Sequence, residues 1–312
     1  MAKAVDGISI GQREMKNKRD FIGYGLNRPS VGWPEDARLA LSIVVNYEEG
    51  SEYSLLDGDL FHEVNNEVPS PVPSDSRDLA NESFFEYGSR VGVWRLLGIL
   101  DQFNVPASFF CCALALERNP DVGREIVRRN HEIVGHGYRW EEYYLMDRES
   151  EKTAIDRTVE TIKDITGVRP LGWYTRYAPS VNTRELVVNE GGFVYDSNSY
   201  SDDIPYYELV NGKPWLVLPY SLEVNDTRFW RGGLYRPSDF LETLKRTFDT
   251  LYEEGKTSTR MMNIGLHCRI AGKPSRSSVL AEFLEYVRTK QGVWFARRID
   301  IANWWLENQP YR

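Results

Sequence analysis

A continuous apolar run near the start of the chain does most to restrict the fold. The segment ARLALSIVVNYEEG spans Ala37–Gly50 and contains few polar residues before Asn46. Such a run is too apolar to alternate between a buried and a solvated face, and it is typical of a central strand in a parallel sheet. Glu48 and Glu49 follow directly. Two carboxylates therefore stand at the carboxyl end of the predicted strand.

Strand-like and helix-like segments then alternate along nearly all of the 312 residues. Further strands are predicted at 107–113, at the apolar run ending at Gly135, and at 171–175, 193–198, 215–220, 261–268 and 293–298. Helices are predicted at 86–103, 121–130, 148–166, 182–190, 237–254, 275–290 and 300–307. This alternation, without a linker or repeat, predicts a single domain over residues 1–312, an α/β barrel of seven or eight parallel strands.

Two segments stand outside this alternation. Residues 1–36 form a polar leader that lacks the apolar core of a signal peptide. Residues 51–82 form a long loop containing the turn-rich stretch VPSPVPSD. A loop of this length in a compact domain is usually functional or disordered, so we expect a lid or a subunit contact, with surface decoration as the alternative.

Charge and cysteine usage restrict the partners and the compartment. The formal net charge of −8 argues against nucleic acid and anionic membranes, and favours a small molecule or a neutral polymer as substrate. Cys111, Cys112 and Cys268 form no spaced disulfide or metal framework, and we expect them to be reduced and buried. No apolar run is long enough to span a membrane. These features predict a cytoplasmic protein.

Polar residues recur at the predicted strand ends. Any one of them also fits a satisfied core residue or a solvated turn. Because the carboxyl ends of barrel strands open on one face, however, the whole set predicts one shared active site. Its members are Glu48, Glu49, His136, Arg176, Asp196, Glu223, Asp226 and His267.

These side chains suit hydrolysis of an amide-like bond. A carboxylate, Glu48 or Glu49, can take a proton from water, and a histidine can protonate the departing nitrogen. An arginine, a histidine or a metal has to stabilise the charge on the carbonyl oxygen. No phosphate loop, GxSxG elbow or HExxH motif occurs, so water is the expected nucleophile.

The chain resembles the polysaccharide deacetylase superfamily, which has a distorted (β/α) barrel called the NodB-like domain. Asn46–Gly50 occupies the place of the first motif, with Glu for Asp. The second motif, His-x-x-x-His, is represented by His136 to Trp140, and the third by Arg176 to Pro179, one residue longer than usual. Gly265-Leu266-His267 loosely matches the last motif.

Within this superfamily the chain is most similar to the cofactor-independent allantoinases of purine breakdown. The similarity lies in the stretches RDFIGYG, NYEEG, FEYGSRVGVWR, HGYRW, RPLGWYT, IGLHCR and RRIDIA. The resemblance implies hydrolysis of a non-peptide C–N bond in a cyclic amide, allantoin to allantoate, without a required metal. It also implies a homo-oligomer, a tetramer in that branch.

The chemistry of the side chains gives a hypothesis for the role of each residue in this reaction. Glu48, or Glu49 if the register differs by one, activates water, while His136 and Arg176 bind the carbonyl oxygen and His267 protonates the ring nitrogen. Asp226 or Glu223 orients a histidine or binds the ring. Trp140 is expected to form a flat wall. The predicted substrate-binding set is Trp140, Tyr138, Asp196, Glu223, Asn225 and Asp226.

Several alternatives remain open at this point. Trp140 cannot ligate a metal because an indole N–H only donates, yet Glu49, His136 and His267 could form a substitute zinc site. The loops after Thr175 and Tyr195 differ from the allantoinase pattern, so a related cyclic imide, a hydantoin or an acyclic N-acyl group also fits. Rival functions are metal-dependent N-deacetylation of polysaccharide or peptidoglycan, and ligand binding without catalysis.

Overall fold

Strand β1 (Leu39–Tyr47) is the centre of the fold, and all nine of its residues are buried. The computed structural model describes residues 19–64, 70–230 and 236–311, so the first half of the predicted leader, residues 1–18, lies outside the described residues. β1 pairs in parallel with β2 (Ala107–Cys111), β8 (Met261–His267) and β9 (Val293–Phe295). The central parallel strand predicted from the apolar run is confirmed.

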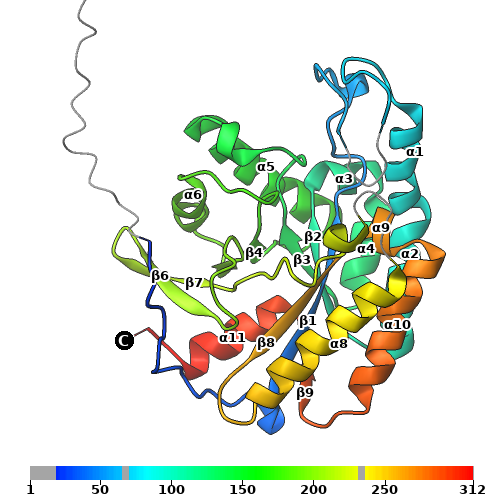
Figure 1. Cartoon of the computed structure of the whole chain (residues 1–312). Helices are drawn as coiled ribbons and strands as arrows, with labels where there is room; N and C mark the ends of the chain where they lie inside the picture. Colours follow the sequence, from blue (N-terminus) through cyan, green and yellow to red (C-terminus); the bar gives the residue numbers. More distant parts are fainter. Residues whose placement is uncertain (1–18, 65–69, 231–235, 312) are drawn as a thin grey trace, which may run out of the picture.

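The strands form one nine-stranded sheet in the order β6-β7-β5-β4-β3-β2-β1-β8, with β9 paired to β1. The remaining strands are β3 (Glu132–Gly135), β4 (Gly172–Trp173), β5 (Tyr195–Asp196), β6 (Tyr206–Val210) and β7 (Lys213–Val217). The sheet curls until the segment after β7 meets β8 at a single parallel bridge between Asn225 and Gly265. The predicted distorted barrel of parallel strands is confirmed (Figure 1).

One strand departs from the prediction. β6 pairs antiparallel with β7 and forms a hairpin at the edge of the sheet, in a segment for which the sequence analysis predicted no strand. Its residues YYELV are only partly buried. A half-solvated edge strand lacks the continuous apolar signal of the central strands, which explains the omission.

Most helices cover the outer side of the curled sheet, whereas the last helix packs with the interior set of strand residues (Figure 1). The α-helices are α1 (Leu79–Tyr87), α2 (Val93–Phe103), α3 (Ala113–Arg118), α4 (Pro120–Arg128), α5 (Arg148–Thr166), α6 (Thr183–Glu190), α7 (Asp226–Trp230), α8 (Pro237–Glu254), α9 (Cys268–Ala271), α10 (Pro274–Arg288) and α11 (Arg298–Asn308). Short 3₁₀ turns, η1 (Pro34–Asp36), η2 (Leu55–Asp57) and η4 (Tyr143–Leu145), add to them.

The helix predicted from residue 86 begins earlier, at Leu79. The Asp78 carboxylate accepts hydrogen bonds from the backbone N–H groups of Ala80 and Asn81, which caps α1. A π-helical turn, η3 (Gly88–Gly92), then joins α1 to α2. The long segment after β1 therefore ends at Asp78 rather than at residue 82.

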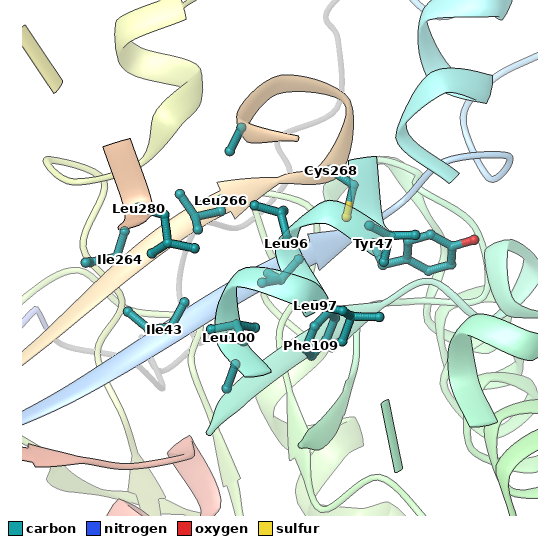
Figure 2. Packing of buried hydrophobic residues seen from close by; sticks show 14 of the residues in the cluster. Ile43, Tyr47, Leu96, Leu97, Leu100, Phe109, Ile264, Leu266, Cys268 and Leu280 are labelled. Atoms are coloured by element: carbon teal, nitrogen blue, oxygen red, sulfur yellow. The ribbon is translucent and has the colours of Figure 1, made fainter. Parts of the chain in front are cut away.

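Alternation along the central strands sorts side chains between two layers. Odd-numbered residues of β1 and β2 and even-numbered residues of β8 pack outward against α2, α8 and α10. Figure 2 shows Ile43 and Tyr47 of β1 packed with Leu96 and Leu100 of α2. The opposite set, including Ala40 and Val44, faces the barrel interior.

The same alternation positions the polar residues that follow the strands. Because successive side chains point to opposite faces, Asn46 and Glu48 continue the interior face of β1. His136 continues the interior face of β3, which carries Val134, and His267 ends the interior face of β8. Three separated segments thus direct acid and imidazole groups into one end of the barrel.

Candidate active site

A cavity of about 490 Å³ opens at the carboxyl end of the strands. Carboxylates, imidazoles, amides and aromatic rings share its wall, and they come from the ends of β1, β3, β4, β7 and β8 together with the segment after β1. Its lining includes Asn46, Glu48, Glu63, His136, Trp140, Glu142, Tyr174, Arg176, Tyr220, Asn225, His267 and Arg269.

Glu48 lies at the centre of this cavity's polar groups. Its Oε1 is 3.2 Å from Nε2 of His136 and 3.5 Å from Nε2 of His267. Its Oε2 accepts a hydrogen bond of 2.7 Å from Nη1 of Arg269. Burial alone would raise the pKa of the Glu48 carboxyl, but the positive charges of His267 and Arg269 hold that pKa well below its usual range. Glu48 is therefore ionised at neutral pH.

Asp226, the first residue of α7, fixes His267 at two points. Its Oδ1 accepts from Nδ1 of His267 at 2.6 Å, and its Oδ2 accepts from the backbone N–H of His267 at 2.7 Å. Burial would lower the pKa of this imidazole, but the Glu48 and Asp226 carboxylates raise it to about 10. His267 therefore carries a proton at neutral pH and can donate it from Nε2.

His136 is oriented by the strand-end segment of β4. Its Nδ1 donates to the backbone carbonyl of Tyr174 at 2.7 Å, and the two rings stack at an interplanar angle of 11°. Because a carbonyl only accepts, the hydrogen on Nδ1 is fixed. Nε2 is consequently the ring nitrogen that faces Glu48 and the cavity.

Another part of the cavity wall is built where the segment that follows β1 meets the segments that follow β3 and β4. Arg176 forms a bidentate ion pair with Glu63, with both Nη–Oε distances at 2.8 Å, and donates to the carbonyl of Trp140 at 2.8 Å. Its guanidinium carbon also lies 3.7 Å from the ring centroid of Trp140. These contacts place Glu63 and Val64 in the cavity wall. The role of this segment as a lid or subunit contact stays a prediction, and residues 65–69 lie outside the described ranges.

Of the residues predicted from the sequence, Glu48, His136, Trp140, Arg176, Asn225 and His267 line the cavity. The others lie elsewhere. Tyr138 donates to Glu117 on the outer side, and Asp196 is buried beneath Arg184 and Trp215. Glu223 lines a second cavity beside α8. Asp226 and Glu49 lie behind the cavity and contact the residues that line it.

Sequence reasoning missed several cavity residues, above all Arg269, Glu63, Asn46 and Tyr220. Asn46 precedes Glu48 by two residues, and Arg269 follows His267 by two residues. The two-residue period of a strand could have indicated Asn46, whereas Arg269 lies in the short helix α9, where that period no longer applies. Glu63 carried no such signal, because it lies in an irregular segment far from any predicted strand end.

Comparison with known proteins agrees with this geometry. The sequence profile described as polysaccharide deacetylase matches residues 82–195. A Schizosaccharomyces pombe protein described as "Putative polysaccharide deacetylase" is 37% identical, over 96% of this chain and 100% of its own length. A Helicobacter pylori peptidoglycan deacetylase is 26% identical, over 76% of this chain and 90% of its own length. The chain belongs to the polysaccharide deacetylase family, whose named relatives are hydrolases.

Two solved structures resemble the whole chain closely. The crystal structure of PuuE allantoinase has a TM-score of 0.90 and 46% identity, covering 95% of this chain and 99% of that chain. The structure described as "probable Polysaccharide deacetylase" from Pseudomonas aeruginosa PAO1 has the same TM-score and identity, covering 95% of this chain and 100% of that chain. The predicted similarity to the allantoinase branch of the family is confirmed.

The three residues considered for a substitute zinc site, Glu49, His136 and His267, do not converge on one point. Glu49 is turned away from the cavity toward the backbone of Arg269, whereas Nε2 of both histidines faces Glu48. Trp140 occupies the place of a second ligand histidine. Across 19–64, 70–230 and 236–311, no three His, Cys, Asp or Glu side chains are grouped so as to hold an ion.

In the same described ranges, no helix is both long and apolar enough to cross a lipid bilayer.

Proposed function

We propose that this protein hydrolyses a C–N bond in a cyclic ureide, opening allantoin to allantoate without a required metal. The observation that carries the proposal is an acid–base pair on the cavity floor: an ionised Glu48 carboxylate 3.5 Å from the Nε2 of a protonated His267. Such a pair can accept a proton from water and donate one to a leaving nitrogen. The similarity to PuuE allantoinase supports the choice of substrate.

The proposed reaction needs only protein groups and water. Glu48 takes a proton from the attacking water while the water oxygen bonds to the ring carbonyl carbon. The C–N bond then breaks, and His267 gives its proton to the ring nitrogen. The proton held by Glu48 passes to Nε2 of His267, which restores both groups, and the new carboxylic acid ionises in solution.

The oxygen of the attacked carbonyl becomes negatively charged during this step. His136 faces the same space as Glu48, with Nδ1 already tied to the Tyr174 carbonyl. We assign Nε2 of His136 to the oxygen; in this role Nε2 carries a hydrogen, because a positioned donor near developing charge supplies much of the catalysis in such sites. Arg176 is paired with Glu63 and Trp140, so we assign it to shaping the wall rather than to the oxygen.

The remaining wall suits a small, planar, polar ring. The rings of Trp140, Tyr174 and Tyr220 line the cavity together with the amides of Asn46 and Asn225. Aromatic faces accept a flat ring, and amide groups match its alternating N–H and C=O groups. The ion pair between Arg176 and Glu63 forms part of the cavity wall, and it would restrict the entry of a polymer chain.

Four substrates separate this proposal from its rivals. The purified protein is treated with a chelator and incubated with allantoin, hydantoin, succinimide or N-acetylglucosamine oligomers, while ring opening or acetate release is followed. We expect chelator-resistant opening of allantoin. If only hydantoin or succinimide were opened, the substrate would be that cyclic amide and not allantoin. If the protein released acetate from the oligomers and the chelator abolished this release, the protein would be a metal-dependent deacetylase, a function supported by the H. pylori relative. Binding without turnover of any substrate would favour a non-catalytic role.

A further inference from the structure

Arg269 is a buried cation that the sequence analysis did not assign. Only 1% of its surface is exposed, and arginine is rarely buried to this degree unless it is paired. Its Nη1 donates to Oε2 of Glu48 at 2.7 Å. Its guanidinium carbon lies 4.7 Å from the ring centroid of Phe85 and 5.0 Å from that of Trp140. The guanidinium is therefore held on the Glu48 carboxylate by aromatic rings.

The backbone of Arg269 is held by a second carboxylate. Oε1 of Glu49 accepts the backbone N–H of Arg269 at 2.8 Å, and Oε2 of Glu49 accepts the backbone N–H of Glu48 at 3.2 Å. Glu49 thus ties the end of β1 to the start of α9. Gly88 leaves the space for this side chain, because a Cβ there would lie 2.4 Å from Oε1 of Glu49.

We propose that Arg269 supplies the fixed positive charge that orients the Glu48 carboxylate for proton transfer, and that Glu49 is the positioning residue that sets Arg269 against it. The assignment of Glu48 as the base rests on the proposed function. The structural claim, that a planar cation is held on that carboxylate, does not depend on the substrate.

The contacts of Arg176 strengthen this assignment. The family resemblance places an active-site arginine at Arg176, but its guanidinium is paired with Glu63 and the Trp140 carbonyl. Within the described residues, no hydrogen bond or ion pair joins Arg176 to Glu48, whereas Arg269 is joined directly. The arginine that contacts the base therefore comes from the end of β8 and not from the segment after β4.

Replacing Arg269 by Ala leaves a space shaped for a planar cation beside Glu48. We expect kcat to fall by about 100-fold or more, as when an electrostatic group is removed from a site. Guanidinium at low concentration should restore part of that activity, whereas urea, which has nearly the same shape but no charge, should not. Equal rescue by urea, or no rescue by either compound, would overturn the proposal.

A binding measurement makes the test independent of turnover. Calorimetry should detect guanidinium binding to Arg269→Ala and not to the double variant Arg269→Ala/Glu48→Gln, which lacks the carboxylate charge. Equal binding to both variants, or binding to neither, would refute the placement of the cation. If the wild type opened no ureide but this binding difference held, the proposed function would fail and the inference would stand.

Two further variants guard against loss of folding. Arg269→Lys keeps a charge but not the planar guanidinium; we expect it to fold and to lose kcat by about tenfold, with KM nearly unchanged. Glu49→Gln should lower kcat rather than raise KM, because it loosens Arg269 without touching the cavity. Arg260→Lys is the matched control: this buried arginine lies before β8, at the opposite end of the strand, and is paired with Glu254. Wild-type kcat in Arg269→Lys and Glu49→Gln would contradict the proposal.

Discussion

Asp226 binds His267 through both of its carboxylate oxygens, one to the imidazole Nδ1 at 2.6 Å and one to the backbone N–H at 2.7 Å. The side chain and the backbone of the histidine are thus fixed by a single residue at the start of α7. This contact explains why Nε2 of His267 points toward Glu48 and carries a proton. Substitution of Asp226 is therefore a direct way to change the pKa and the orientation of the proposed proton donor, His267.

Replacing Asp226 by Asn should move the alkaline limb of the rate profile. The substitution keeps the shape but removes one of the two charges that raise the pKa of His267 to about 10. That pKa should fall, so activity should decline at a lower pH than in the wild type, and kcat should drop by about 10- to 100-fold. The measurement is kcat/KM against pH. Asp249→Asn, at an exposed site contacting Tyr286, should leave the profile unchanged; an unmoved alkaline limb in Asp226→Asn would exclude His267 as the donor.

Replacing Glu48 by Gln should reduce turnover far more than binding. Gln keeps the volume and can still accept a hydrogen bond from Arg269, but it cannot take a proton from water. We expect kcat to fall by about 100- to 10,000-fold while the substrate dissociation constant changes little. Steady-state kinetics together with equilibrium binding separate the two effects. Full activity in this variant would remove Glu48 from the mechanism.

His267 should also make stability depend on pH. The native imidazole keeps its proton up to about pH 10, whereas an unfolded histidine loses it near 6.5. Between these values the native state binds more protons, so the stabilising contribution is complete below pH 6.5 and is lost as the pH rises toward 10. Urea unfolding across this range should show a falling free energy of unfolding, with a smaller slope in His267→Gln. The same slope in both proteins would mean that His267 is not protonated in the native state.

The ion pair between Arg176 and Glu63 should control access to the cavity. Glu63→Gln removes the charge from a partly buried bidentate pair, so the segment around residue 63 should open more readily. We expect KM to rise by several-fold, kcat to change little, and proteolysis within residues 51–64 to accelerate. Glu82→Gln is the matched control, because Glu82 forms an exposed bidentate pair with Arg77 away from the cavity and such pairs contribute little. Similar KM values in both variants would argue against a gating role.

The sequence predicted those site residues that follow a regular strand. Glu48, His136 and His267 each extend the interior face of β1, β3 or β8, so the period of the strand was sufficient to bring them together. The fold followed from the same apolar runs, except for β6, whose half-solvated residues give a weak strand signal. Asp196 is the last residue of β5, but its carboxylate pairs with Arg184 of α6, a contact that no local pattern indicates.

The periodicity of strands could not predict contacts between irregular segments. Glu63 approaches Arg176 only because the segment after β1 folds back over the strand ends, and its position in the sequence carries no periodic signal. Arg269 was missed for a different reason. It lies in the short helix α9, just past the end of β8, where the period of the strand no longer predicts the direction of a side chain.

The contact between Gly88 and Glu49 offers a last test of how the base is positioned. A Cβ at Gly88 would lie 2.4 Å from Oε1 of Glu49, so Gly88→Ala should push that side chain away from the backbone of Arg269. Forcing a methyl group into a packed site costs about 1–3 kcal/mol, and kcat should fall because Arg269 shifts relative to Glu48. Gly98→Ala in α2 is the control: nothing lies within 4 Å of its added Cβ, and alanine there should stabilise the helix by about 0.5–1 kcal/mol. Thermal unfolding and kcat together test the idea, since a Gly88→Ala variant that loses stability but keeps wild-type kcat would show that Glu49 holds the fold and not the base.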